Sequence, residues 1–378
     1  MKQLSTVRRR IRASLVVAAA AAIALSACAD EAADTTEAEV DEAADTTEAE
    51  VDESIEDDPD PVTLSFTTPL PENHPVHLGF WNWVDMLEEE APWVEIDFRG
   101  GPEVMGAFDQ FDAVRAGSID GAPLPEVYYD AQVPPVAMMG LSPYMPWEER
   151  ENGIFEMHQQ WHSEVGNVHY LGKVYAGIPF VLFTNEPVDG ADLSGQIIRS
   201  AGANAALVEA LGGESLNLPP PELYTALERG TVDGYIFASV GSADASWHEV
   251  VDYEISPRFF TTNMNLIINE DTWNSLDERT QQVLAETAEA NEHEVVEMYQ
   301  DLAVTEIEAY RDAGVELVEL SADDEARFLE AAYTEGWEGI GWDSIVAQSP
   351  VTQEIRDLFE EGYGEDFVDA VPGREIFE

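Results

Sequence analysis

The stretch of sequence that decides the fold is SGQIIRSAGANAALVEALGGESLNLPPPELYTALERGTVDGYIFA, residues 194–238. An apolar run that ends at Arg199 predicts a strand, and the alanine-rich run after it predicts a helix that ends at Gly212. The same order then repeats. Prolines begin the second helix and a glycine ends it, which is the usual asymmetry of helix ends. We therefore expect a β–α–β–α–β segment, the building unit of a parallel α/β sheet.

Arg199 stands at the carboxyl end of the first predicted strand and directly before a predicted helix. Ligands of α/β sheets bind beyond the carboxyl ends of strands, and the start of a helix adds free N–H groups and a positive dipole. A guanidinium also offers two parallel donors that match a carboxylate. The pattern predicts an anion site at Arg199; a salt bridge to one of the chain's own acids is the alternative.

Strand and helix patterns also alternate before this stretch. Residues 62–66 and 93–99 alternate apolar and polar side chains, as half-buried strands do, and residues 74–90 between them have helical spacing of apolar residues. The apolar face predicted for this helix consists of Leu78, Trp81, Val84 and Leu87. The alternation predicts an α/β sandwich with parallel strands.

A helical pattern of unusual length follows over residues 277–313, without internal glycine or proline. At 1.5 Å per residue such a helix would span about 50 Å. This length exceeds one lobe of a chain of this size, so we expect the helix to bridge two lobes. A strand over 315–320 and a helix that begins at Ser321 are predicted after it.

The chain is strongly acidic, because 77 Asp and Glu against 17 Lys and Arg give a net charge of −60 over 378 residues. This charge argues against a nucleic-acid partner, since phosphate binding requires clustered Lys and Arg, and against adsorption to an anionic membrane surface. Lysine occurs only at Lys2 and Lys173. An acidic surface nearly free of lysine indicates a protein that works in high salt, where repulsion is screened; an ordinary acidic extracellular protein is the alternative.

The N-terminus predicts a targeting segment rather than part of the fold. Basic residues up to Arg12 precede the apolar run 13–25, and the letters LSAC then end at Cys28, the only cysteine. This arrangement resembles a bacterial lipoprotein signal over residues 1–28, with Cys28 as the lipid-modified first residue of the mature protein. Ordinary secretion by cleavage nearby is the alternative. With Cys28 lipidated, the mature protein has no disulfide.

Residues 29–60 predict a disordered acidic linker. The unit DEAADTTEAEV occurs at 30–40 and again at 41–51, and residues 30–60 hold 16 acidic residues and no basic one. Such a segment has little to bury and extends by self-repulsion. No later apolar run reaches the roughly 18 residues of a spanning helix. We therefore expect a lipid-anchored protein at the outer face of the cytoplasmic membrane or in the periplasm.

No catalytic motif stands out. His158 and His162 are spaced i, i+4, as metal ligands on one helical face are, but the adjacent glutamate of a zinc hydrolase is missing. Exposed helix histidines are the preferred interpretation. The glycines of residues 98–106 fit neither nucleotide-binding signature, and no G-x-S-x-G sequence occurs. These observations predict a protein that is not an enzyme.

The region around Arg199 resembles a signature of the solute-binding proteins of tripartite ATP-independent periplasmic (TRAP) transporters. The matching features come in the family's order: the Arg199 strand, EALGG, Glu222, Tyr224, TALERG and TVDG. FTNEPV (183–188) and MNLIINEDTWNSLDERTQQVLAETAEA (264–290) resemble the family's upstream and downstream elements. The resemblance extends over roughly residues 62–340, and a lipoprotein signal fits it.

The resemblance implies an α/β protein with a two-lobed periplasmic-binding-protein-like fold (type II-like), hinge strands and a long lobe-spanning helix. Residues 61–182 would form mainly lobe 1 and residues 183–264 mainly lobe 2. Residues 265–378 would supply a crossover strand, the bridging helix and C-terminal helices that pack on both lobes. The lobes would close over a small organic acid and deliver it to membrane permease subunits that use an ion gradient rather than ATP.

In this resemblance Arg199 is the arginine that clamps the ligand carboxylate. The sequence departs from the family at Phe180, where many members have a second ligand arginine, and at Phe237, where many have asparagine. Both changes replace a polar contact by an aromatic one. We therefore expect a monocarboxylate, such as a keto, hydroxy or aromatic acid, rather than sialic acid or a C4-dicarboxylate.

The remaining candidate ligand contacts are aromatic or polar side chains. They are Tyr128, Tyr129 and Glu103 in the first lobe, and Trp247 and Asn263 further along the chain. No cofactor is expected, while a metal ion such as Ca²⁺ beside the ligand stays open. A solute-binding lipoprotein of another transporter or sensor class is the nearest alternative function, and an extracellular enzyme is the alternative from a different class.

Overall fold

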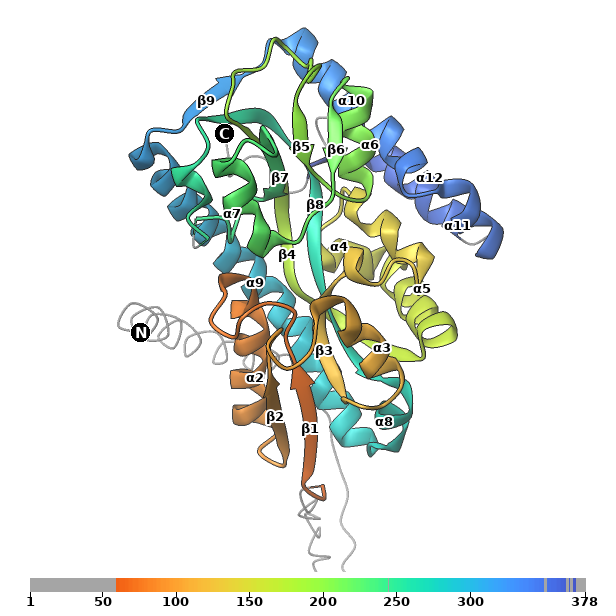
Figure 1. Ribbon diagram of the computed structural model, residues 1–378. Coiled ribbons are helices and arrows are strands. Elements are labelled where there is room, and N and C mark those ends of the chain that lie inside the picture. The colour runs from red at the N-terminus through yellow and green to blue at the C-terminus, as the bar shows by residue number, and fades with distance from the viewer. Residues whose placement is uncertain (1–58, 244, 350–351, 365–366, 368–369, 372–378) are drawn as a thin grey trace, which may run out of the picture. The chain divides into compact units, whose positions relative to one another are not determined.

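A nine-stranded mixed sheet is the frame of the residues that the structure describes, with the strand order β2-β1-β3-β8-β4-β7-β5-β6 and β9 beside β8 (Figure 1). The strands are β1 (Val62–Thr67), β2 (Val94–Gly100), β3 (Gly121–Pro125), β4 (Val168–Thr184), β5 (Ile197–Arg199), β6 (Glu214–Leu216), β7 (Gly234–Ala238), β8 (Tyr253–Asn269) and β9 (Glu316–Glu319). The predicted β–α–β–α–β stretch is present as β5 to β7.

The computed structural model describes residues 59–243, 245–349, 352–364, 367 and 370–371. The predicted signal peptide with Cys28 and the acidic linker up to residue 58 lie outside the described residues. Among the described residues, no helix combines the length and the apolar character needed to cross a bilayer.

The sheet is not wholly parallel, which corrects the prediction of parallel strands. β1 pairs in parallel with β2 and β3, and β5 pairs in parallel with β6 and β7. In the centre, however, the 17-residue strands β4 and β8 are antiparallel to each other, and β3 and β7 are antiparallel to them. Local sequence patterns predict strands but not the direction in which distant strands pair.

The two central strands join two lobes. β3 pairs with one end of β8, at Met264–Ile268, whereas β7 pairs with the opposite end of β4, at Phe180–Thr184. Figure 1 shows β1–β3 in the lower lobe and β5–β7 in the upper one, with β4 and β8 running through both. The predicted two-lobed fold with hinge strands is therefore present, and both predicted lobe boundaries fall within these two strands.

The backbone of the hinge strands is irregular where they pass from one lobe to the other. The β4–β8 register shifts repeatedly between Tyr170 and Leu182. Gly177 has φ +70°, and a Cβ atom at this position would come within 3.2 Å of the Met145 sulfur. Phe260 in β8 has φ +50°. Positive φ favours glycine, so Gly177 is required by both conformation and space.

Helices cover the sheet. They are α2 (Leu78–Glu90), α3 (Gln110–Arg115), α4 (Pro146–Glu151), α5 (Ile154–Trp161), α6 (Ala203–Ala210), α7 (Pro220–Glu228), α8 (Glu270–Ser275), α9 (Glu278–Ala313), α10 (Ala322–Gly339), α11 (Trp342–Gln348) and α12 (Thr352–Gly362). Short turns of other helix types are η1 (Pro75–His77), η2 (Ala107–Asp109), η3 (Glu126–Tyr128), η4 (Pro134–Leu141), η5 (His162–Gly166) and η6 (Trp247–Glu249).

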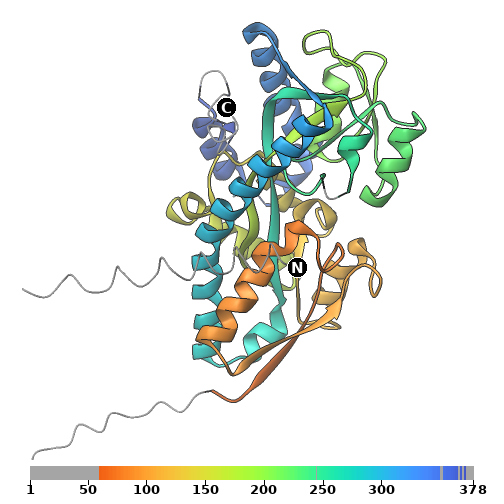
Figure 2. The ribbon, with the colours of Figure 1, turned by 90° about the vertical axis from the view of Figure 1, so that its left-hand side faces the viewer.

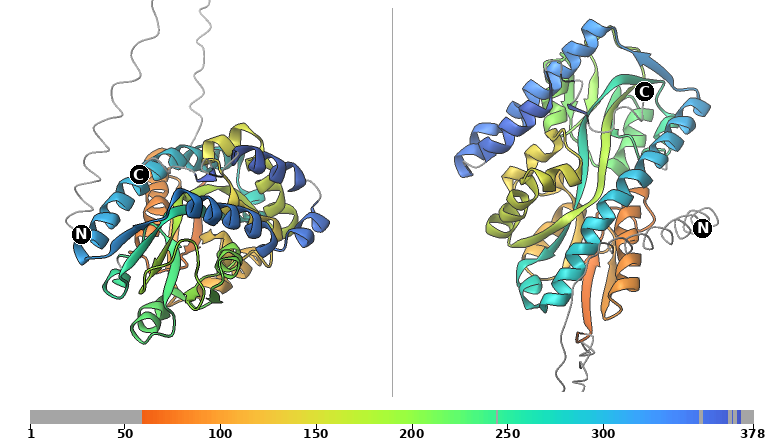
Figure 3. Two further views of the ribbon diagram at one scale, coloured as in Figure 1. Left: turned by 90° about the horizontal axis from the view of Figure 1, so that it is seen from above. Right: turned by 180° about the vertical axis from the view of Figure 1, so that it is seen from behind.

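The 36-residue helix α9 confirms the predicted long helix. The Asp277 side chain caps its start by accepting a hydrogen bond from the Thr280 N–H, and Gly314, with φ +94°, ends it. The helix packs against β4 and α2 and runs along both lobes (Figures 2 and 3). It therefore bridges the lobes, as its length predicts.

Helix α2 buries a different face from the predicted one. Phe80, Trp83 and Leu87 are buried against β1 and α9, whereas Leu78, Trp81 and Val84 are only partly buried. Only Leu87 was placed correctly. Both sets have helical spacing, and the helix is apolar around much of its circumference, so its orientation is decided by packing. The Trp83 indole N–H donates a hydrogen bond to Thr287 Oγ1 of α9 at 3.1 Å.

The C-terminal helices pack against earlier parts of the chain. α10 packs against α6 and β8. The segment before α4 holds α12, because Tyr144 donates a hydrogen bond to the Leu358 carbonyl and Tyr363 donates one to the Leu141 carbonyl.

Candidate functional site

Arg199 is the last residue of β5, at the strand end that the sequence predicts. Its Nε donates a hydrogen bond to the Leu218 carbonyl at 3.1 Å, and its Nη1 donates one to the Ile236 carbonyl at 3.2 Å. In the part of the chain that the structure describes, no carboxylate forms an ion pair with Arg199. Among these residues, neutral carbonyls rather than acids hold the guanidinium, so no fixed anion cancels its charge.

Tyr128 is a residue of lobe 1 that interacts electrostatically with Arg199 of lobe 2. It ends η3, directly after β3, and thus belongs to the lobe opposite Arg199. Burial raises the pKa of Tyr128, and the positive charge of Arg199 lowers that pKa in part. Burial also lowers the pKa of Arg199, while Tyr128 raises it. Each side chain therefore lies within electrostatic reach of the other, which directs the loop after β3 towards the carboxyl end of β5.

Phe237 borders the site on the side of lobe 2. The guanidinium carbon of Arg199 lies over its ring, 5.9 Å from the ring centre. Trp247 packs edge-on against Phe237 at 4.8 Å and is itself buried against Tyr235. Phe237 therefore lies next to the cation, and Trp247 supports Phe237 from behind.

Phe180 lies on β4, where its backbone pairs with Ala238 and Phe259. Its half-buried ring packs against the largest core cluster. Phe180 thus lies on a hinge strand, in the same layer as β7.

Tyr129 and Tyr128 are neighbours in sequence but lie in different surroundings. Tyr129 is fully buried and stacks on Phe111, with ring centres 4.5 Å apart. Its hydroxyl accepts a hydrogen bond from Asn265 Nδ2 at 2.6 Å and pairs with His162 Nε2 at 2.9 Å. The structure therefore places Tyr129 in the core of lobe 1, apart from the meeting point of Tyr128 and Arg199.

Asn263 belongs to a buried polar network around Glu126. Its Nδ2 donates hydrogen bonds to Glu126 Oε2 and to the Met139 carbonyl, both at 3.3 Å. Glu126 begins η3, two residues before Tyr128, and its second oxygen has no hydrogen-bond partner among the described residues. Burial raises the pKa of Glu126 to about 7, although the nearby Lys173 ammonium lowers it. A buried carboxyl group with this pKa retains its proton below neutral pH.

Lys173 is the cation of this network. Its Nζ forms an ion pair with Glu149 Oε2 at 2.6 Å, and Ser142 Oγ donates a hydrogen bond to the other Glu149 oxygen at 2.7 Å. The sequence contains one clue to this role, because Lys173 is one of only two lysines. No comparable signal separates Glu126 from the many other acidic residues.

Glu103 lies in an exposed loop after β2. Its Oε1 accepts a hydrogen bond from the Gly101 N–H at 2.7 Å, and this bond lowers the pKa of the Glu103 carboxyl. The carboxylate therefore stabilises its own loop, in which Gly101 is followed by Pro102.

His158 and His162 are buried, which corrects their interpretation as exposed helix histidines. His162 Nδ1 pairs with the His158 carbonyl at 2.8 Å, and its Nε2 pairs with the Tyr129 hydroxyl. Burial lowers the pKa of His162 to about 4 and that of His158 well below 6.5. Both rings are neutral and serve the core of lobe 1.

Residues 66–337 match the family model described as bacterial extracellular solute-binding protein, family 7. This protein belongs to that family. The match confirms the predicted class of protein, since it extends over most of the chain and includes β5–β7 and α9.

A curated relative of this family 7 protein is the monocarboxylate 2-oxoacid-binding periplasmic protein of Nostoc sp. strain PCC 7120. The two chains are 24% identical over 209 residues, which are 50% of this chain and 55% of the relative. The match thus spans about half the length of the curated relative.

Solved structures of TRAP periplasmic solute-binding proteins have the same fold. The protein from Desulfovibrio salexigens, with bound orotic acid, has a TM-score of 0.69 at 20% identity and covers 82% of this chain and 99% of its own. The protein from Chromohalobacter salexigens, with bound D-glucuronate, has a TM-score of 0.68 at 19% identity, covering 79% and 99%. That from Colwellia psychrerythraea, with bound calcium and pyruvate, has a TM-score of 0.69 at 17% identity, covering 80% and 94%. These likenesses confirm the predicted two-lobed α/β fold.

The described residues of the family 7 protein contain no group of three or more His, Cys, Asp or Glu side chains placed to hold a metal ion. At the carboxyl end of β7, next to Arg199, the side chains of Ile236 and Phe237 are apolar. Neither of these side chains can coordinate a cation.

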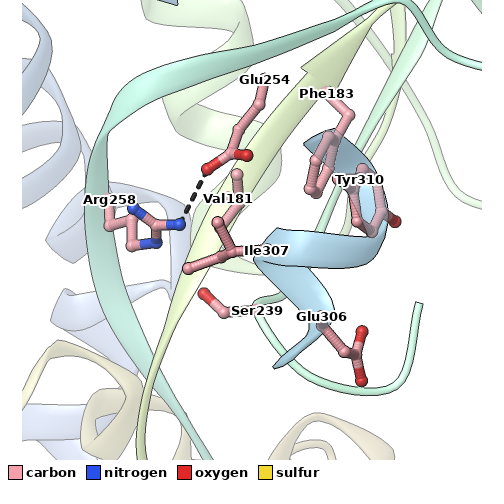
Figure 4. A pocket seen from close by; sticks show the side chains of 8 residues that line it. All are labelled: Val181, Phe183, Ser239, Glu254, Arg258, Glu306, Ile307 and Tyr310. Atoms are coloured by element: carbon pink, nitrogen blue, oxygen red, sulfur yellow. Dashed lines mark hydrogen bonds and ion pairs between the residues drawn. The ribbon is translucent and has the colours of Figure 1, made fainter. Parts of the chain in front are cut away.

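A separate cavity in lobe 2 is too small for an organic acid. It has a volume of about 10 Å³ and is lined by the side chains that Figure 4 labels, among them Glu254, Arg258 and Tyr310. Glu254 forms ion pairs with Arg258 at 2.8 Å and with Arg311 at 2.9 Å. Space of this size holds at most one water molecule, and the carboxylate there already has two cationic partners. The candidate ligand site is the meeting point of Arg199 and Tyr128, where the cation has no acidic partner among the described residues.

Proposed function

We propose that this protein is the extracytoplasmic solute-binding protein of a TRAP transporter, which captures a small organic monocarboxylate between its lobes and delivers it to the membrane permease. The observation that carries this proposal is Arg199. Its guanidinium has no acidic partner among the described residues and lies near Tyr128 of the other lobe. The names of the similar proteins support an organic acid as the ligand, since they include a 2-oxoacid-binding protein and complexes with orotic acid and pyruvate.

A carboxylate bound at Arg199 would favour lobe closure. A ligand shifts a conformational equilibrium only by its different affinity for the two states. In the closed state the anion would contact Arg199 of lobe 2 and Tyr128 of lobe 1 together, whereas in an open state it would contact one of them. Because the guanidinium is partly desolvated, its charge-assisted hydrogen bonds to a carboxylate are stronger than in water.

The surroundings of Arg199 favour one carboxylate over two. Phe237 supplies aromatic surface beside Arg199, and Phe180 on the hinge strand β4 offers neither charge nor amide, whereas a dicarboxylate or a sugar acid would need further polar anchors. A Ca²⁺ ion beside the ligand is a second candidate feature, which the calcium and pyruvate bound to the Colwellia protein support.

The domain organisation is proposed on the same basis. Residues 61–182 form mainly lobe 1 and residues 183–264 mainly lobe 2, while residues 265–378 supply the remaining crossover strand and helices. β4 and β8 act as the hinge, because their register and backbone change between the lobes. Lipid attachment at Cys28 would tether the protein at the outer face of the cytoplasmic membrane or in the periplasm.

The proposal is tested by titrating the purified protein without residues 1–56, which lie outside the folded unit Asp57–Glu378. Small mono- and dicarboxylates are titrated in high salt, with and without calcium. We expect one class of monocarboxylate to raise the melting temperature by mass action. Arg199→Ala should abolish this rise, and Arg99→Ala, which removes an exposed arginine paired with Asp97, is the matched control. A rise that survives Arg199→Ala would overturn the assignment, and enzymatic turnover of the bound acid would favour the alternative of an extracellular enzyme.

A further inference from the structure

Three large apolar side chains of lobe 1 are exposed on the loops that follow β2 and β3. Val104 is 59% exposed, Phe108 is 56% exposed and Val127 is 49% exposed. Exposed apolar side chains in the loops beside a candidate ligand site can contact the ligand, because such sites are lined mainly by apolar groups. Together with the Tyr128 ring, these three side chains are called the apolar wall below.

The members of the apolar wall come from loops that are joined to one another. The Phe108 ring packs on the Tyr128 ring with centres 4.7 Å apart, and Val127 precedes Tyr128 in η3. Gln110 fixes the loop after β2, because its Nε2 donates hydrogen bonds to the Thr68 carbonyl after β1 at 2.8 Å and to the Met105 carbonyl at 3.2 Å. The contact between the Phe108 and Tyr128 rings joins this loop to η3.

Tyr128 connects the apolar wall to the cation of lobe 2. The same residue packs on Phe108 and lies within the electrostatic influence of Arg199. In lobe 2 the Arg199 guanidinium lies over the Phe237 ring, which packs against Trp247. A carboxylate held by Arg199 thus has aromatic rings from both lobes beside it.

We propose that the ligand is an aromatic monocarboxylate, whose ring binds between Phe108 and Tyr128 of lobe 1 and Phe237 of lobe 2 while Arg199 binds its carboxylate. This inference rests on the proposed function and names the substrate class. Aromatic rings prefer offset or edge-to-face contacts with other rings, and the exposed face of Phe108 supplies such a contact. An acid without a ring would leave the apolar wall in water, so it would bind more weakly.

The test compares matched pairs of acids that differ only in a phenyl group: phenylpyruvate with pyruvate, phenyllactate with lactate, and phenylacetate with acetate. Affinities are measured by calorimetric titration of the wild type, Phe108→Ala, Arg199→Ala and the control Val304→Ala, which truncates an exposed apolar side chain of α9. For at least one pair, we expect the wild type to bind the phenyl acid about tenfold or more tightly than its partner. Phe108→Ala should remove most of this preference without weakening the partner acid, and Val304→Ala should keep it.

The outcomes separate the inference from the function on which it rests. If acids without a ring bind as tightly as their phenyl partners, or if Phe108→Ala leaves the phenyl acid unaffected, the aromatic class is wrong although Arg199 still binds carboxylates. If Arg199→Ala binds every acid like the wild type, or the wild type binds none, the proposed function fails as well. Because Phe108 is exposed, its truncation should leave the melting temperature nearly unchanged, which excludes loss of folding as the cause.

Discussion

Lys173 Nζ lies 2.6 Å from Glu149 Oε2 in the interior of the protein, where the two side chains are 1% and 4% exposed. The pair connects the hinge strand β4 to α4. In a chain with only two lysines, one of them is therefore used for a buried ion pair close to Glu126 rather than on the surface.

Loss of this lysine should destabilise the protein strongly. Lys173→Met leaves the buried Glu149 carboxylate without its cation, which we expect to cost about 3 kcal/mol or more of unfolding free energy. Chemical denaturation in high salt measures the change. Arg99→Ala, which breaks the exposed pair with Asp97, should cost less than about 1 kcal/mol. Equal effects of the two variants would contradict a structural role of the buried pair.

Substitution of Arg199 should lower affinity more than stability. Arg199→Ala is expected to weaken binding of the ligand carboxylate by about 100-fold, and Arg199→Lys by about tenfold, because an ammonium cannot donate two parallel hydrogen bonds. The melting temperature without ligand should stay near that of the wild type, since the guanidinium bonds only to two carbonyls among the described residues. Calorimetric titration and thermal melts check both parts. If Arg199→Lys binds with full affinity, a positive charge alone is enough to bind the ligand carboxylate, and the two parallel hydrogen bonds are not needed.

Glu126 should make stability fall as pH rises. Burial raises its pKa to about 7 from the ordinary 4.5, so the folded protein retains a proton that the unfolded chain releases. This stabilising contribution is complete below pH 4.5 and is lost as pH rises through about 7, at up to roughly 1.4 kcal/mol for each unit.

The matching experiment measures unfolding free energy between pH 5 and 8 for the wild type, Glu126→Gln and Glu126→Leu. Both variants lack the titrating group, so both should show a smaller decline with pH than the wild type, whatever packing each one loses. The surrounding groups are Lys173, Glu149, Asn263 and Asn265. If all three proteins follow the same pH dependence, Glu126 is ionised in the folded state.

A side chain at Gly177 should strain the hinge. Gly177→Ala would force a residue with a Cβ atom into φ +70° and bring that atom within 3.2 Å of Met145 and Val296, costing about 1–2 kcal/mol of stability. Gly195→Ala is the matched control, because Gly195 has φ +84° but a Cβ atom there would meet nothing within 4 Å. The difference between the two variants in denaturation isolates the contact at the hinge, and equal losses would show that only the backbone conformation matters.

The two-lobed α/β fold could be predicted from the sequence, because the patterns that indicate its strands and helices lie within short segments. Helical spacing and capping residues predict α9 at 277–313, and the structure has it at Glu278–Ala313. Proline at the start and glycine at the end likewise delimit α7 within residues 194–238. The same local signals place Arg199 at a strand end, which made it the leading candidate for the site.

Other features depended on how distant segments pair. The antiparallel pairing of β4 with β8 turns a predicted parallel sheet into a mixed one. The packing of α2 on α9 selects Phe80 and Trp83 for burial over neighbours with equal helical spacing. No pattern within a segment contains this information, because each choice depends on the surface that another segment presents.

By itself, then, the sequence determined the order of strands and helices, the long bridging helix and the position of Arg199, since periodicity and helix caps act between residues close in the chain. Only the tertiary structure decided that Tyr128 lies near Arg199 while the adjacent Tyr129 is buried beside His162. It also decided that Glu126 is buried next to the Lys173–Glu149 pair. The physical reason is that neighbouring side chains point in different directions, and the packing of the two lobes determines which of them reaches the ligand site.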